Sequence, residues 1–297
     1  MVKNLNYLMD QVRNSVKKKI VIAAAEDLDV LEVVEKAVEL QLGGFILIGD
    51  KAQIEKIAAE NHKKMDFTLI HEPDHKKAAE KAVELVLKGE AGAIMKGLLH
   101  TGTFLKAVLN KEKGLNRGKL ISQISIFDKE FGDGLQLLTD CAMAIQPSLD
   151  EKKQIIENAV ELALRLGYVK PKVAVLSALE VVNPEIADTV DAAILSKMSD
   201  REQIKNAIVD GPFALDNAIS PEAAKHKGIK GEVAGQADII LAPNLQVGNV
   251  LTKALTYYAH MDVAAAVMGA AAPIIMTSRT DTVKNKLLSI ALASYIS

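Results

Sequence analysis

Three residues near the C-terminal end combine side chains that could bind a phosphate and transfer a proton. Ser278, Arg279 and Asp281 follow the apolar run 272–276 and precede an apolar, helix-like tail. This pattern predicts that a strand gives way to a helix here, and α/β enzymes bind ligands beyond the carboxyl ends of their parallel strands. A helix N-terminus adds N–H groups for an anion, and a guanidinium fits a phosphate through two parallel hydrogen bonds. We therefore predict a site for a phosphate-bearing substrate.

Each of the three residues also has a plain structural interpretation. Ser278 could donate to a developing oxyanion or cap the last helix, and Asp281 could accept a proton or be the N-cap of that helix. Arg279 could be a surface residue at the end of a strand. Spacing alone leaves these alternatives open.

Other residues with reactive side chains give weaker signals. The loop from Lys96 to Thr103 contains two glycines but lacks the Lys-Ser or Lys-Thr pair of a Walker motif. Cys141 stands among apolar residues, which favours a small buried hydrophobe over a nucleophile. The histidines share no ligand spacing, so we expect no zinc or other metal site.

Composition excludes several classes of protein. An aromatic fraction of 4% and a formal charge of -2 argue against a nucleic-acid partner. The N-terminal residues include Lys3, Asp10 and Arg13, so we expect no signal peptide, and the longest apolar run is too short for a membrane span. A single cysteine indicates a reducing compartment, and we expect the protein to be cytoplasmic.

Short apolar runs alternate with helical patterns from Ile20 onward, which is typical of an α/β fold with mainly parallel sheets flanked by helices. At 297 residues the chain suits two such domains with a cleft between them. The sequence predicts strands at 19–25, 45–48, 67–70, 92–95, 172–177, 207–209 and 237–241, and a hairpin formed by 120–127 and 135–139.

Five short motifs occur in one order along the chain. Together they resemble the phosphate acetyl/butyryltransferase family, with the butyryl branch as the closest match, and the resemblance covers nearly the whole chain. The motifs are Lys96-Gly-Leu-Leu-His-Thr, Thr139-Asp-Cys-Ala, Asp210-Gly-Pro-Phe-Ala-Leu-Asp, Pro243-Asn-Leu-Gln-Val-Gly-Asn and Thr277-Ser-Arg-Thr-Asp.

The resemblance implies a fold like that of isocitrate and isopropylmalate dehydrogenases. Residues 1–148 and 272–297 would form a first α/β domain, and 149–271 a second one inserted into it. It also implies reversible acyl transfer between coenzyme A and inorganic phosphate, with coenzyme A as a substrate, no tightly bound cofactor, and a homodimer or higher homo-oligomer.

The resemblance further implies roles for individual residues. Asp281 would deprotonate the coenzyme A thiol, Arg279 would hold the phosphoryl group, and Ser278 would donate to the tetrahedral oxyanion. The remaining implied residues would bind substrate; they are Lys96, Thr101, Thr103, Lys106, Asp210, Asn244, Gly248 and Asn249.

Two positions depart from the acetyltransferase branch. That branch has its proposed base six residues after the arginine, where this chain has Asn285, an amide that cannot take up a proton. It also has an arginine near the position of Lys106, and lysine lacks the bidentate fork of a guanidinium.

Three alternatives stay open at this point. The first is acetyl rather than butanoyl transfer. The second is a metal-dependent decarboxylating dehydrogenase, which would need a carboxylate cluster that the sequence does not show. The third is a protein that binds a phosphorylated small molecule without turnover.

Overall fold

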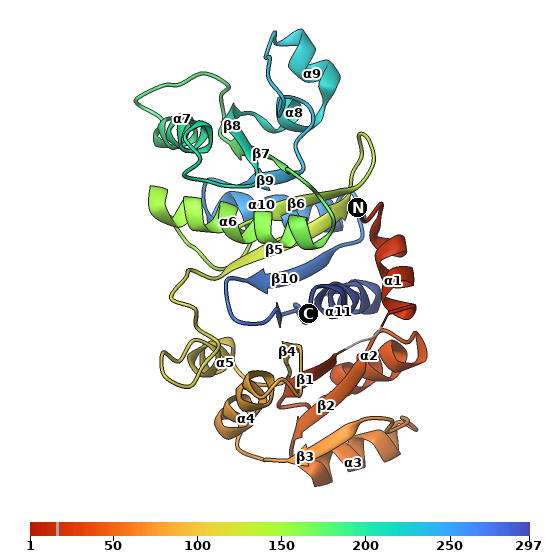
Figure 1. Ribbon diagram of the computed structural model, residues 1–297. Helices are drawn as coiled ribbons and strands as arrows, with labels where there is room; N and C mark the ends of the chain where they lie inside the picture. The colour runs from red at the N-terminus through yellow and green to blue at the C-terminus, as the bar shows by residue number, and fades with distance from the viewer. Residues whose placement is uncertain (16–17) are drawn as a thin grey trace. The chain divides into compact units, whose positions relative to one another are not determined.

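The computed structural model describes residues 1–15 and 18–297 (Figure 1). Strands and helices alternate along most of the chain, so the predicted α/β fold is confirmed. The chain divides into two compact units. We call residues 6–119 with 264–297 the terminal unit, and residues 1–5 with 120–263 the central unit.

The described residues of the terminal unit form six strands in the order β3-β2-β1-β4-β11-β10. They pair in parallel except for β10 and β11, which are antiparallel. The strands are β1 (Lys19–Ala23), β2 (Gly44–Gly49), β3 (Thr68–His71), β4 (Ala93–Lys96), β10 (Ala264–Met268) and β11 (Ile274–Ile275). The carboxyl ends of β1, β4 and β11 therefore lie at the same edge, which positions the residues that follow them.

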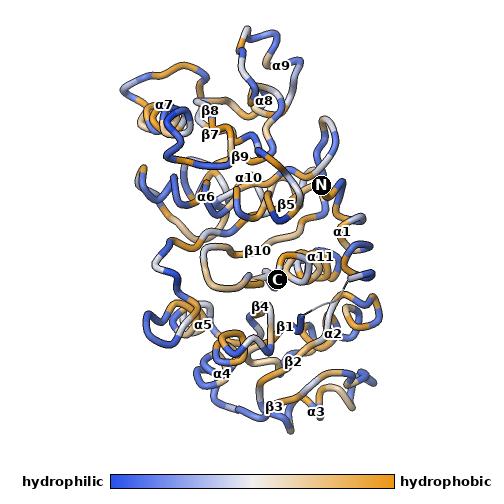
Figure 2. Tube along the Cα trace, in the orientation of Figure 1, coloured by the Kyte–Doolittle hydropathy of each residue, from blue (hydrophilic) through white to orange (hydrophobic). Residues whose placement is uncertain are grey.

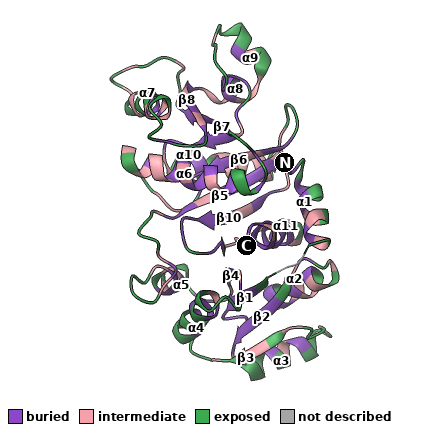
Figure 3. Ribbon diagram, viewed as in Figure 1, coloured by how far each residue is buried: buried purple, intermediate pink, exposed green. Residues whose placement is uncertain are grey.

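Helices cover both faces of this sheet. One core cluster joins α2, α3 and α11 to β1 and β2, whereas α4 packs against β1, β2, β4 and α5. Figure 3 shows that α11 is buried along almost its whole length, which explains its apolar sequence. The helices are α1 (Leu5–Arg13), α2 (Leu28–Glu39), α3 (Lys51–Glu60), α4 (His75–Leu87), α5 (Thr101–Val108) and α11 (Val283–Ile296).

The central unit contains five strands in the order β5-β6-β9-β7-β8. The predicted hairpin is confirmed, since β5 and β6 pair antiparallel, and the other pairs are parallel. The strands are β5 (Ser122–Asp128), β6 (Leu135–Thr139), β7 (Lys172–Leu176), β8 (Ile208–Phe213) and β9 (Ile239–Leu241). The helices are α6 (Leu149–Arg165), α7 (Ala187–Asp200), α8 (Leu215–Ile219), α9 (Pro221–His226) and α10 (Leu245–Tyr257).

The two units divide the chain at other places than the predicted domain boundaries at 148/149 and 271/272. Residues 120–148 belong to the central unit because β6 pairs with β9. Residues 264–271 belong to the terminal unit, where Val267 of β10 is paired with Ile274 of β11. That each unit folds as a domain of its own stays a prediction.

Local sequence signals account for several element boundaries. Asp27, Asp50 and Asp74 each accept a hydrogen bond from a backbone N–H in the first turn of the helix that follows. Figure 2 shows hydrophobic and hydrophilic residues alternating around α3, whose Ile54 and Ala58 are buried. These aspartates therefore mark where the helices after β1, β2 and β3 begin.

Candidate active site

The three residues with predicted chemistry lie on the connection between β11 and α11. The carboxylate oxygen Oδ2 of Asp281 accepts a hydrogen bond of 2.7 Å from the backbone N–H of Ser278, and the N–H of Asp281 donates to the carbonyl of Ser278 at 3.1 Å. The hydroxyl of Ser278 lies 2.9 Å from that of Thr280. The chain is therefore folded into a tight turn, in which Arg279 is exposed.

Both capping interpretations from the sequence are wrong. Thr282 is the N-cap of α11, and its hydroxyl accepts a hydrogen bond from the N–H of Asn285 at 3.2 Å. Neither Ser278 nor Asp281 is needed to begin the helix. Their side chains instead hold the turn that precedes it.

Ser278 and Arg279 line a small hollow of about 80 Å³ in the terminal unit. We call it the cation hollow, because three cationic side chains, Lys96, Arg279 and Lys286, line it together with only two acidic ones, Asp27 and Asp29. The remaining lining residues are Val30, Val33, Met95, Gly97, Leu98, Thr277 and Ser278. Such a charge balance favours an anionic ligand.

Lys96 links this hollow to the loop after β4. Its ammonium group donates to the carbonyls of Gly97 at 3.0 Å and Leu99 at 3.1 Å. Burial, and next the nearby charge of Arg279, lower the pKa of Lys96, while Asp27 acts in the opposite direction. Lys96 and Arg279 both line the cation hollow, and the effect of Arg279 on the pKa of Lys96 agrees with that proximity.

Gly97 has a steric reason to lie beside this lysine. Its N–H donates to the carbonyl of Ala23 at 2.9 Å, and a Cβ at Gly97 would lie 2.0 Å from the carbonyl oxygen of Ala24. Only glycine lets the loop approach β1 this closely. The close approach fixes the position from which Lys96 enters the cation hollow.

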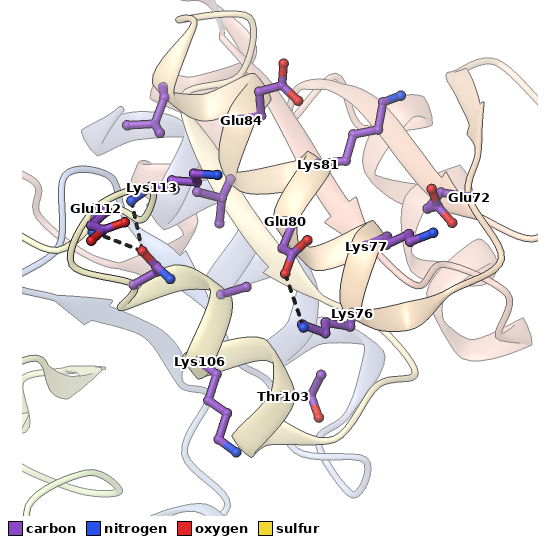
Figure 4. Close-up of a pocket in the computed structure, with 14 residues that line it drawn as sticks. Glu72, Lys76, Lys77, Glu80, Lys81, Glu84, Thr103, Lys106, Glu112 and Lys113 are labelled. Carbon is purple, nitrogen blue, oxygen red and sulfur yellow. Dashed lines mark hydrogen bonds and ion pairs between the residues drawn. The ribbon is translucent and has the colours of Figure 1, made fainter.

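Two of the predicted substrate-binding residues face a different hollow. Thr103 and Lys106 of α5 line a broad hollow of about 970 Å³ whose other lining residues are mostly charged and include the ion pair of Lys76 and Glu80 on α4 (Figure 4). Thr101 is exposed at the first turn of α5, whose N-cap His100 makes no side-chain capping bond. The N–H groups of this turn therefore have no side-chain cap from His100.

The other four predicted substrate-binding residues lie in the central unit. Asn244 is the N-cap of α10, and the Asn249 amide donates to the carbonyl of Cys141 at 3.2 Å. A Cβ at Gly248 would lie 2.0 Å from the carbonyl oxygen of Asp140. Asp210 accepts hydrogen bonds from the Gly211 N–H at 2.8 Å and from the hydroxyl of Ser196 at 3.3 Å. Their substrate-binding roles stay predictions, and all four have contacts that support the fold.

Cys141 behaves as the sequence indicated. Its side chain is buried, and burial raises the pKa of the thiol to about 11. A thiol with such a pKa is protonated at neutral pH and is a poor nucleophile.

Within 1–15 and 18–297, no three His, Cys, Asp or Glu side chains gather into a group able to hold a metal ion. Across the same ranges, no helix has both the length and the apolar character that a membrane crossing requires.

Sequence reasoning missed the residues of the cation hollow that come from α2 and α11. Asp27 and Asp29 come four and six residues after the end of β1 at Ala23, and strand order would have placed them beside the end of β4. Lys286 gave a weaker signal, because it is one of two lysines in the first turns of a mainly apolar helix. Such a cation is unfavourable beside a helix N-terminus unless it has a partner.

Comparison with known proteins shows the family of this chain. The family described as phosphate acetyl/butaryl transferase matches residues 4–81 and 58–294. Phosphate butyryltransferase of Clostridium acetobutylicum is 48% identical over 100% of this chain and 99% of its own length. Phosphate acetyltransferase of Thermotoga maritima is 41% identical, covering 93% of this chain and 94% of its own. A crystal structure of a branched-chain phosphotransacylase from Enterococcus faecalis V583 superposes with a TM-score of 0.83 at 34% identity, covering 94% of this chain and 98% of its own. The chain therefore belongs to the phosphate acetyl/butaryl transferase family.

Proposed function

We propose that this protein reversibly transfers a short acyl group between coenzyme A and inorganic phosphate, with butanoyl-CoA and phosphate giving butanoyl phosphate and coenzyme A. One observation carries the proposal: Lys96 and Arg279 line one hollow with Ser278, just beyond the parallel strands β4 and β11. Phosphate is the substrate that two converging cations suit. Membership of the family supports the reaction class.

In the direction of thioester formation, the coenzyme A thiol loses its proton and the thiolate attacks the carbonyl carbon of the acyl phosphate. The tetrahedral intermediate collapses when the bond to the phosphate oxygen breaks, and phosphate leaves. Arg279 holds the phosphoryl group in place, and the hydroxyl of Ser278 donates to the oxyanion. In the reverse direction a phosphate oxygen attacks the thioester and the thiolate leaves.

We assign the proton transfer to Asp281. A free thiol has a pKa of about 8.5 and is mostly protonated at neutral pH, so it needs a general base, and the carboxylate of Asp281 would take up its proton as the sulfur attacks. The Ser278 N–H already donates to Oδ2 of Asp281, which leaves Oδ1 to take the proton. Asn285, six residues after Arg279, cannot replace it because an amide does not accept a proton at neutral pH.

The acyl chain is tested by rates over acetyl-, propanoyl-, butanoyl- and hexanoyl-CoA at saturating phosphate. We expect the largest kcat/KM for butanoyl-CoA. Each missing methylene should lower kcat/KM by about 10- to 200-fold at most. A maximum at acetyl-CoA would make the protein a phosphate acetyltransferase. Thermal stabilisation by phosphate without release of thiol from any thioester would make it a binding protein.

We further propose that the protein is a homo-oligomer and that α10 pairs with a second copy. This helix buries only Gly248, whereas Val250, Tyr257 and Tyr258 are 66%, 54% and 89% exposed. Beside it lies an apolar hollow of about 90 Å³ that can receive an aromatic side chain; its lining includes Phe127, Phe131, Leu215, Ile219, Leu251, Leu255 and Met261.

The charges near α10 also fit a second copy of the chain. Lys253 is the only charged residue of α10, and Glu130 lines the apolar hollow. A copy related by twofold symmetry would bring each lysine toward the other copy's acid. Sedimentation velocity should give a dimer or larger species that Val250→Asp with Tyr258→Asp converts to monomer. A monomeric wild type would refute this interface.

We place the reaction in the cytoplasm, with no tightly bound cofactor and no nucleic-acid or membrane partner. The single cysteine among 297 residues and the charge of -2 support this setting. Purified protein should be active after exhaustive dialysis against a chelator.

A further inference from the structure

Lys286 occupies an unfavourable position for a lysine. Its side chain is only 10% exposed, and it lies close to the N-terminus of α11, where the helix dipole disfavours a cation. Its ammonium group lies 3.5 Å from Oδ2 of Asp29, whose side chain is 64% exposed. An ion pair with so exposed a partner contributes little stability. The fold alone therefore gives little reason to bury this charge.

The surroundings of Lys286 supply such a reason. It lines the cation hollow with Lys96 and Arg279, and each of the three comes from a different segment of the chain. Of the two acids there, Asp27 already accepts a hydrogen bond from the N–H of Val30 at 3.2 Å. Asp29 is thus the acid whose ion pair with Lys286 can be replaced by an incoming anion.

We propose that Lys286 is a third phosphate-binding cation of this site and that Asp29 is its counter-ion when phosphate is absent. The inference rests on the proposed function, because it assigns the hollow to the phosphate of that reaction. Phosphate entering beside Arg279 gains a charge-assisted hydrogen bond from Lys286, whose ammonium group turns away from Asp29. The N-terminus of α11 then faces an anion, which its dipole favours.

The first test compares Lys286→Met with wild type. Methionine keeps an unbranched apolar stem of nearly the same length but removes the charge. We expect KM for phosphate to rise at least about 10-fold, the value of one hydrogen bond to a charged group. KM for butanoyl-CoA should stay within about twofold. Lys286→Arg should keep most of the phosphate affinity, since it retains the charge.

Lys284→Met is the matched control. Lys284 lies on the same helix two residues earlier, is exposed and does not line the cation hollow. This variant should leave KM for phosphate unchanged. An equal rise in both methionine variants would mean that general surface charge, rather than Lys286, attracts phosphate, and would overturn the proposal.

Asp29→Asn separates binding from a structural role. If Asp29 competes with phosphate for Lys286, its neutralisation should lower KM for phosphate by about two- to fivefold, the value of an exposed ion pair. If the pair only ties α11 to α2, Asp29→Asn and Lys286→Met should both lower the melting temperature and leave KM for phosphate unchanged. That second result would overturn the proposal.

Calorimetric titration with inorganic phosphate keeps this inference distinct from the proposed reaction. Wild type should bind phosphate, and Lys286→Met should bind it at least about 10-fold more weakly. Wild-type binding without any release of thiol from butanoyl-CoA would refute the reaction but not the role of Lys286. Equal binding by wild type and Lys286→Met would refute the role of Lys286, even if the reaction proceeds.

Discussion

The carboxylate of Asp281 accepts a hydrogen bond from the backbone N–H of Ser278 at 2.7 Å, so the proposed base and the proposed oxyanion donor belong to one turn. The two roles are therefore coupled, because a change that releases the carboxylate also frees Ser278 to move. A substitution that keeps the turn while removing the charge is needed to separate them.

Asp281→Asn is that substitution, since an amide oxygen can still accept the bond from Ser278 but cannot take up a proton. We expect kcat for thioester synthesis from butanoyl phosphate to fall at least about 100-fold, as for loss of a general base. KM for both substrates and the melting temperature should change little. Steady-state kinetics and thermal unfolding measure these effects.

A different outcome would move the base elsewhere. Full activity in Asp281→Asn would show that the carboxylate only holds the turn. The same conclusion would follow if Asp281→Asn had a lower melting temperature and its kcat fell only in proportion to the fraction of folded protein. Asp281→Ala, which also loses the hydrogen bond, should then be the less stable of the two variants.

Two glycines of the loop after β4 should respond oppositely to alanine. A Cβ at Gly97 would lie 2.0 Å from the carbonyl oxygen of Ala24, whereas a Cβ at Gly102 meets no atom within 4 Å. We expect Gly97→Ala to cost about 1–3 kcal/mol of unfolding free energy. Gly102→Ala, in α5, should be neutral or stabilising by up to about 1 kcal/mol. Urea unfolding of both proteins measures this difference, and equal stability would contradict the close approach of the loop to β1.

Most of the fold followed from the sequence because its signals are local. Apolar runs such as 44–49 and aspartates at helix starts such as Asp50 fix an element without reference to distant residues. The boundaries between the two units could not be predicted from such local signals. They depend on pairings such as that of β6 with β9, between segments about a hundred residues apart in the chain.

The site was predictable only in part for the same reason. Arg279 and Ser278 were found because they directly follow an apolar run, and Lys96 through a motif. Lys286 and Asp29 were missed, since a single charge on a helix becomes meaningful only when strand order brings other charges beside it. The N-cap was not identified, because Ser278, Asp281 and Thr282 can all cap a helix and the sequence does not show which one does.

The pKa of Lys96 predicts how phosphate binding depends on pH. Burial, and then Arg279, lower this pKa from the ordinary lysine value of 10.5. In the window between the folded and unfolded pKa values the unfolded chain binds more protons, so the contribution of Lys96 to stability increases as pH rises through it. Phosphate binding changes in the opposite sense, because the cation loses its charge.

We therefore expect KM for phosphate to rise with pH, and this rise should begin below pH 10.5. The rise should be steeper in wild type than in Lys96→Met. The methionine variant should have the higher KM at neutral pH but lack this part of the rise. KM for butanoyl-CoA over the same pH range is the control. Parallel pH profiles in the two proteins would remove Lys96 from the phosphate site.

The most direct test of the account is the release of free thiol from butanoyl-CoA as a function of phosphate concentration, in wild type and in Arg279→Ala. We predict phosphate-dependent release by wild type and a loss of at least about 100-fold in kcat/KM for phosphate in the variant, as for removal of a transition-state donor. Its melting temperature should be unchanged, because the residue is exposed. No release from any short acyl-CoA, or equal rates in the two proteins, would contradict the account.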